Sequence, residues 1–171
     1  MKLYKKILGA LTGCALAIAP VSATIDEGTP DLLKTIDESG IKLTFNSPEH
    51  CDDGQYLGVY IHRGMQRALA LCPGDTVDPI DHAVVRHEVW HAIQHCFNVV
   101  RGTPLNTPIQ DDIPTLMASV EEHLDDSYVR VVQENYDRSQ WLLELEANVA
   151  MVALSAAEIQ ELFVMACIAD F

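Results

Sequence analysis

The chain has 171 residues, of which 11 are Lys or Arg and 25 are Asp or Glu, so its formal net charge is −14. Such a negative chain is a poor candidate for binding nucleic acid or an anionic membrane surface, because phosphate contacts need clustered basic side chains. Hydrophobic residues make up 49% of the sequence, which at this length allows a folded domain with a real core.

Residues 1–23 have the three parts of a secretory signal peptide. Three lysines lie within the first six residues, an apolar run covers 7–19, and small residues lead up to a cleavage site after Ala23. The apolar run is short for a bilayer span, so we expect no stable membrane insertion after cleavage. The sequence therefore predicts a secreted or periplasmic protein. The alternative is a lipoprotein anchored through Cys14, because the segment LTGC is similar to a bacterial lipobox.

Cleavage would leave residues 24–171 as a single domain, with eight basic and 25 acidic side chains and a net charge of −17. Four cysteines remain, and an even number in an exported chain favours up to two disulfides. Four cysteines allow three connectivities, and the sequence does not choose among them. One plausible arrangement pairs Cys51 with Cys72 around a hairpin and Cys96 with Cys167 between two helices.

The first part of the mature chain carries strand signals. Residues 24–31 have the composition of a linker, and a short helical or extended piece follows up to Gly40. Three runs rich in β-formers come next, separated by turn residues. They cover residues 41–45, 56–62 and 67–72, with a hairpin turn at 63–66.

The hydrophobic spacing then changes from two residues to 3.6, which is typical of helices. Asp78 can cap the first helix, with Pro79 at its first position and Asp81 in its first turn, and this helix runs to about Asn98. After a proline-rich loop at 101–114 we expect helices at 114–135, at 140–154 and from Ser155 to Ala169. The prediction is an α+β fold, in which a three-stranded N-terminal sheet packs on the first helix and a helical C-terminal half follows.

The first helix contains the segment HEVWH, in which His87, Glu88 and His91 form an H-E-x-x-H motif. Residues four apart lie on one face of a helix, so both imidazoles can reach one ion. Glu88 lies one step around the helix, where it can accept a proton from a metal-activated water without binding the metal. The helix is apolar on most of its other sides, which favours a central, partly enclosed site.

Two histidines need a third protein ligand to hold zinc. His95 lies about 6 Å further along the helix, so we expect it to line the cleft and not to bind the ion. Glu144 and Glu146 both interrupt a later apolar helix and point in nearly opposite directions. We favour Glu144 as the ligand, since Asn148 follows four residues later and could orient a metal-bound histidine from outside. We expect Glu146 on the solvent-facing side.

The combination of H-E-x-x-H with the later segment ELEAN resembles the gluzincin group of zinc metallopeptidases. In particular, ELEAN is similar to the third-ligand motif of the CAAX-prenyl-protease-like and ImmA/IrrE-type families. The resemblance implies a zincin-like domain with His87, His91 and Glu144 as ligands, Glu88 as general base and Asn148 as the outer partner. It also implies that the edge strand of the small sheet binds an extended peptide by strand addition.

The resemblance covers about five residues at each of two places, so it implies chemistry but no biological role. The chain lacks the transmembrane helices of the prenyl-protease group and a DNA-binding partner domain. The hypothesis is an exported zinc metallopeptidase acting on a peptide or protein substrate, with zinc as its cofactor. Four side chains are candidates for stabilising the oxyanion, namely Tyr136, Tyr128, His123 and His95. The alternative is a catalytically inactive, zincin-like module that binds metal or a partner protein.

Overall fold

The computed structural model describes residues 28–51, 57–72 and 81–169. The predicted signal peptide, its cleavage site after Ala23 and the lipobox cysteine Cys14 lie outside these residues. The described part is a mixed α+β structure with seven α-helices and one three-stranded sheet. Among its helices, none combines the length and the hydrophobicity needed to cross a membrane.

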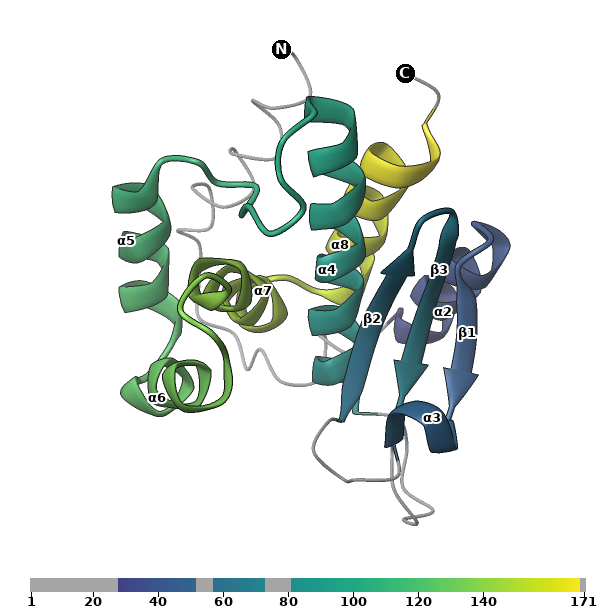
Figure 1. Cartoon of the computed structure of the whole chain (residues 1–171), viewed down its shortest axis with the longest axis horizontal. Helices are drawn as coiled ribbons and strands as arrows, with labels where there is room; N and C mark the ends of the chain where they lie inside the picture. Colours follow the sequence, from purple (N-terminus) through teal and green to yellow (C-terminus); the bar gives the residue numbers. More distant parts are fainter. Residues whose placement is uncertain (1–27, 52–56, 73–80, 170–171) are drawn as a thin grey trace.

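The sheet consists of β1 (Lys42–Phe45), β2 (Gly58–Arg63) and β3 (Gln66–Leu71) in the spatial order β1-β3-β2. β2 and β3 form the predicted antiparallel hairpin, and β1 pairs with β3 in parallel. β2 is therefore an edge strand, and it lies beside the long central helix (Figure 1). The short helix α3 (Pro48–Cys51) follows β1.

The central helix α4 (His82–Arg101) carries the H-E-x-x-H motif. It begins later than predicted, because Asp81 has an extended conformation and its carboxylate accepts hydrogen bonds from the N–H groups of Ala83 and Val84. Asp81 is therefore the cap and not a first-turn residue. The predicted cap Asp78 and its neighbour Pro79 lie outside the described residues.

The sequence left a helical or an extended conformation open for the segment before β1. The structure shows that it is a helix, α2 (Thr29–Glu38). The predicted helix at 114–135 is two helices, α5 (Ile113–His123) and α6 (Asp126–Asn135). The chain turns because Leu124 is extended and the Asp125 carboxylate accepts hydrogen bonds from Ser127 N–H and Tyr128 N–H, which starts a new helix.

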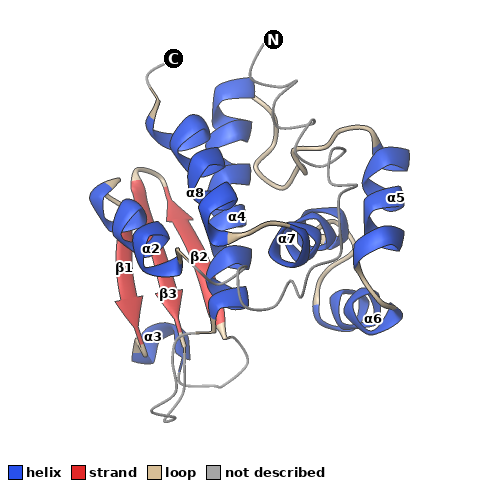
Figure 2. Ribbon diagram, turned by 180° about the vertical axis from the view of Figure 1, so that it is seen from behind, coloured by secondary structure: helices blue, strands red, loops and turns tan. Residues whose placement is uncertain are grey.

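The last part of the chain contains α7 (Trp141–Ala153), α8 (Ala156–Phe163) and a π-helical turn at Val164–Ile168. Ser155 and Glu158 form the predicted capping box at the start of α8. Figure 2 shows α8 lying beside α4 and α2 lying against the sheet.

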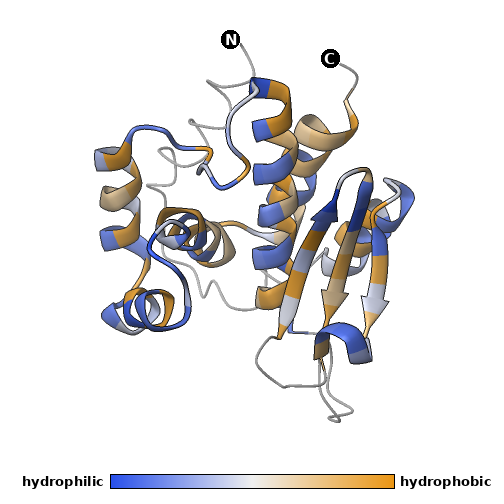
Figure 3. Ribbon diagram, in the orientation of Figure 1, coloured by the Kyte–Doolittle hydropathy of each residue, from blue (hydrophilic) through white to orange (hydrophobic). Residues whose placement is uncertain are grey.

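Two apolar cores fill the interior, and the ribbon in Figure 3 shows hydrophobic bands on the elements that enclose them. The larger core lies among the sheet, α2, α4 and α8, with Leu32, Leu69, Trp90, Ile93 and Phe163 among its buried members. The smaller core joins α5, α6 and α7 and includes Leu116, Val120, Val132, Leu145 and Val149. Helix α7 contributes to both, since its Ala147 and Ala150 belong to the larger core.

Both plausible disulfides are present. Cys51–Cys72 links α3 to the end of β3, and Cys96–Cys167 links α4 to the π-helical turn. This connectivity is confirmed among the three that four cysteines allow.

Candidate metal centre

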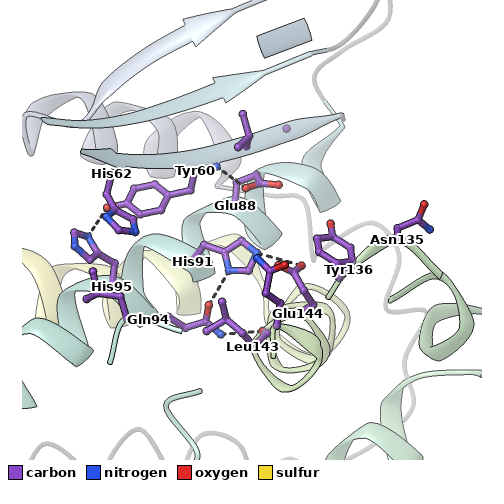
Figure 4. Close-up of a pocket in the computed structure, with 14 residues that line it drawn as sticks. Tyr60, His62, Glu88, His91, Gln94, His95, Asn135, Tyr136, Leu143 and Glu144 are labelled. Carbon is purple, nitrogen blue, oxygen red and sulfur yellow. Dashed lines mark hydrogen bonds and ion pairs between the residues drawn. The ribbon is translucent and has the colours of Figure 1, made fainter. Parts of the chain in front are cut away.

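Three predicted ligands converge at the junction of α4 and α7. His87 Nε2 lies 3.1 Å from His91 Nε2, and Glu144 Oε2 lies 3.3 Å from the former and 3.4 Å from the latter. The histidines lie on one face of α4 because they are one turn apart, and Glu144 reaches them from the first turn of α7. Figure 4 shows His91 and Glu144 facing one another across this junction.

The donor triangle has the dimensions of a metal site. A tetrahedral zinc ion with bonds of about 2.0–2.1 Å separates its ligands by roughly 3.3–3.4 Å. Glu144 is only 5% exposed, and its buried Oε2 faces the two imidazole nitrogens, where a positive charge is needed to offset the cost of burying a carboxylate. The group His87, His91 and Glu144 could therefore hold a metal ion.

Gln94 fixes the orientation of His91. Its Nε2 donates hydrogen bonds to Glu146 Oε2 at 2.8 Å and to the Leu143 carbonyl at 3.0 Å, so its Oε1 must be the atom 2.7 Å from His91 Nδ1. His91 Nδ1 therefore carries the proton, and Nε2 faces the other two donors as a ligand requires. Sequence reasoning missed Gln94, although a polar residue three positions after His91 in a buried helix was the available signal.

Glu146 does not lie on the solvent-facing side, so that expectation is wrong. It is 1% exposed and accepts hydrogen bonds from Gln94, Trp90 and the main-chain N–H groups of Ile109 and Gln110. Burial raises the pKa of its carboxyl above the ordinary value, and these hydrogen bonds oppose the rise. Glu146 thus anchors the loop between α4 and α5 against the two helices.

Asn148 lies one turn after Glu144, and its side-chain amide donates to the Glu144 main-chain carbonyl at 2.8 Å. Its hydrogen bond thus supports the backbone that carries the ligand, whereas the direct partner of His91 is Gln94. The role of Asn148 in orienting a metal-bound histidine stays a prediction.

Glu88 is held beside the donors by the sheet. Its Oε2 accepts a hydrogen bond from the Tyr60 main-chain N–H at 2.8 Å, and its side chain is 7% exposed. Gly58 makes this approach possible, because a Cβ at that position would lie 2.7 Å from Val84 Cγ1 and 2.8 Å from Glu88 Cγ. The edge strand thus positions the carboxylate that the sequence predicts as the general base.

Electrostatic interactions link the pKa values of two candidate ligands, His91 and Glu144. Burial alone would lower the pKa of His91, but its hydrogen bond with Glu144, together with the charges of Glu144 and Glu88, raises it to about 9. Burial alone would raise the pKa of Glu144, but the hydrogen bonds and charges of His87 and His91 lower it to about 2. In the metal-free protein the two groups therefore form a buried ion pair around neutral pH.

Two of the three candidate ligands, His91 and Glu144, line a cavity of about 360 Å³ between β2, α4 and α7, whereas His87 is not among its lining residues. Glu88, His91, Gln94 and Glu144 line it. Of the four oxyanion candidates, His95 and Tyr136 line the cavity, on opposite sides of His91 in Figure 4. Tyr128 and His123 are not among its lining residues.

Comparisons with protein-family models, with curated proteins and with solved structures find no match for this chain.

Proposed function

We propose that this protein is an exported zinc metallopeptidase of zincin-like architecture. The observation that carries the proposal is the convergence of two imidazole nitrogens and a buried carboxylate oxygen within 3.1–3.4 Å of one another. Three protein ligands beside an open cavity are typical of a catalytic zinc site, whereas a structural site is closed by four. Two imidazoles and one carboxylate form a donor set that suits zinc.

A zinc ion held by His87, His91 and Glu144 would supply Lewis-acid activation of a water and of the scissile carbonyl. Glu88 would accept the proton of the attacking water and deliver it to the leaving amine. The N–H of Tyr60 supports this role, because it holds the Glu88 carboxylate in place through Oε2. Tyr136 and His95 are the remaining candidates for stabilising the oxyanion, since both line the cavity.

The outer edge of β2 supports a peptide substrate. Gly58, Val59, Tyr60 and His62 all line the cavity, so an extended chain can lie beside the strand. The Tyr60 N–H points to Glu88 and away from β3, as expected for the outward groups of an edge strand. Export is supported by two disulfides, which persist in oxidising compartments.

The experiment that tests the proposal combines metal analysis with hydrolysis of an unstructured protein such as casein. The native protein should contain one zinc per chain, and His87→Ala and Glu144→Gln should each lose it. Glu88→Gln should keep the zinc and hydrolyse casein at least about 100-fold more slowly, because it lacks the general base. Glu121→Gln, at an exposed position in α5, removes the same charge as a control and should leave both properties unchanged.

The same assay separates the alternative function. If Glu88→Gln and the native protein hydrolyse casein equally, or neither does while zinc is bound, the peptidase assignment is wrong and the inactive metal-binding module stands. If the native protein binds no divalent metal, both assignments are wrong.

A further inference from the structure

A second cluster lies beside the candidate metal centre and has no place in the chemistry described above. Tyr60 and His62 project from the same face of β2, and Arg67 is the cross-strand partner of His62 on β3. The imidazole of His95, from α4, stacks on His62 with ring centroids 4.5 Å apart and planes inclined by 18°. The Tyr60 hydroxyl lies 2.8 Å from His95 Nδ1. Figure 4 shows Tyr60, His62 and His95 gathered at one side of His91.

This cluster is basic within a very acidic chain. The three strands hold Lys42, Arg63 and Arg67 but no Asp or Glu. Among the described residues, no carboxylate lies within ion-pair distance of His62, Arg67 or His95. The pKa of His95 is lowered by burial and then by the positive charges of His62 and Arg67, and an anion placed here would counter the fixed charge of Arg67.

The cluster also offers a hydrogen-bond donor to a ligand. Burial raises the pKa of Tyr60 to about 12, so its hydroxyl keeps its proton. When that hydroxyl donates to His95 Nδ1, the proton of a neutral His95 ring lies on Nε2, where it is available to an acceptor. Tyr60, His62 and His95 line the cavity, whereas Arg67 does not; it is half-buried beside His62, donates a hydrogen bond to Cys96 Sγ and supplies a fixed charge.

The distance between the cluster and the candidate metal centre can be expressed in residues of an extended peptide. His95 follows His91 by one turn, a rise of about 6 Å along α4. An extended peptide advances roughly 3.3 Å per residue, so the cluster lies about two residues from the position of the scissile bond.

We propose that His62, His95 and Tyr60, with Arg67 beside His62, form a subsite for a carboxylate of the peptide substrate, about two residues to one side of the scissile bond. This inference rests on the proposed peptidase function and names its substrate class as acidic peptides. The carboxylate has two sources, an Asp or Glu side chain or the C-terminus of the peptide. Both present the same planar acceptor to the imidazole donors.

The test is cleavage of synthetic peptide libraries, one with amidated and one with free C-termini, by the zinc-loaded protein. Asp and Glu should be enriched about tenfold at one position, about two residues from the cleaved bond, because a charge-assisted hydrogen bond contributes that much discrimination. Enrichment that persists in amidated peptides identifies the side chain as the source. Cleavage confined to about two residues from a free C-terminus identifies the terminal carboxylate.

Variants separate the subsite from general charge effects. His62→Ala and Arg67→Gln should abolish the enrichment, and Arg63→Gln is the matched control because Arg63 is exposed on the opposite face of β2. His62→Glu should shift the preference towards Lys and Arg, which a purely structural role of His62 would not do. Equal cleavage of acidic and neutral peptides by the native protein overturns the subsite and leaves the peptidase function intact.

A binding measurement shows which of the two proposals has failed, the carboxylate subsite or the peptidase function. Zinc-loaded Glu88→Gln protein is titrated with acetyl-Ala-Glu-Ala-amide and with the Gln counterpart, and the ring signals of His62 and His95 are followed by NMR. Larger shifts with the Glu peptide support the subsite even if the native protein hydrolyses nothing. Equal shifts with the two peptides overturn it.

Discussion

Gln94 determines which nitrogen of His91 faces the candidate metal centre. Its amide bridges His91 to the buried carboxylate of Glu146, and Glu146 in turn holds the main chain at Ile109 and Gln110. A continuous hydrogen-bonded path thus runs from a candidate ligand, His91, to the loop between α4 and α5. Outer partners of this kind set both the orientation and the basicity of a metal-bound histidine.

Replacing Gln94 should therefore weaken metal binding without removing a ligand. We expect Gln94→Met to lower zinc affinity about 10- to 100-fold, because His91 loses the acceptor that fixes its tautomer. Competition with a chromophoric chelator measures the affinity. Asn148→Ala is the control, since Asn148 contacts only the Glu144 main chain in its described hydrogen bond. An equal loss in Asn148→Ala would restore Asn148 as the orienting partner.

Zinc binding should release a proton from His91. The pKa of His91 in the metal-free protein is about 9, so zinc affinity should rise with pH, by up to about tenfold per unit, until that value is passed. Isothermal titration in buffers of different ionisation enthalpy counts the released protons. An affinity that is flat between about pH 6 and about pH 8 would contradict a protonated His91.

The buried ion pair of His91 and Glu144 should affect the stability of the metal-free protein. The raised pKa of His91 stabilises the fold fully below its ordinary 6.5, and the effect is lost as pH rises through about 9. The lowered pKa of Glu144 stabilises the fold fully above its ordinary 4.5, and the effect is lost as pH falls through about 2. The contribution of the His91–Glu144 pair to the free energy of unfolding should therefore be complete between about pH 4.5 and 6.5. Chemical denaturation at several pH values would measure it, by comparing the single variant His87→Ala with the double variant that also carries Glu144→Gln.

At the residue scale, helical spacing was enough to place His87 and His91 on one face of α4, and the later motif on α7 predicted that Glu144 would join them, as it does in the structure. The role of Glu88 as general base stays a prediction. Spacing could not predict the burial of Glu146. Its partners include main-chain groups of the loop at 109–110, and no periodicity in α7 encodes that loop.

At the scale of elements, the contact between β2 and α4 determines where Glu88 lies. Gly58 is the point of closest approach, and its backbone is that of an ordinary strand residue, so the requirement for glycine is steric. Any side chain there must displace Val84 Cγ1 or Glu88 Cγ.

We expect Gly58→Ala to cost about 1–3 kcal/mol of unfolding free energy, as overpacking does. Hydrolysis should fall more than zinc affinity, because the substitution moves Glu88 and the edge strand but neither imidazole. Thermal unfolding, casein hydrolysis and zinc content measure the three effects. Native hydrolysis in Gly58→Ala would show that the close packing of β2 on Glu88 is not needed.

The element boundaries show the limits of sequence patterns. The three strands, α7 and the capping box of α8 follow from periodicity and cap residues, whereas the first residue of α4 was misplaced because Asp81 caps the helix. The break between α5 and α6 was missed, because Leu124 continues the apolar pattern while Asp125 competes as a cap. Local hydrogen bonding of Asp125 prevailed over periodicity.

At the scale of the whole molecule, the two disulfides should contribute unequally. Cys96–Cys167 closes 71 residues and Cys51–Cys72 closes 21. Loop-closure entropy gives about 4 kcal/mol for the longer loop and about 3 kcal/mol for the shorter. Urea denaturation of Cys96→Ser, Cys167→Ser should show the larger loss than Cys51→Ser, Cys72→Ser. The reverse order would mean that packing around the shorter bridge dominates.

The α+β class could be predicted from sequence, since strand signals come before most of the helical signals, whereas helix α2 before β1 was left open and helix α3 after β1 was not predicted. The pairing of β1 with β3 in parallel and the division of the interior into two cores could not be predicted. Both depend on contacts between segments far apart in the chain, for which a single sequence holds no periodic signal.

Helix α7 gives one side to each core, and this sharing has a thermodynamic consequence. If either half unfolds, an apolar side of α7 becomes exposed to solvent, although the core of the other half still needs this helix. Heat should therefore produce one calorimetric peak, whose van't Hoff and calorimetric enthalpies agree.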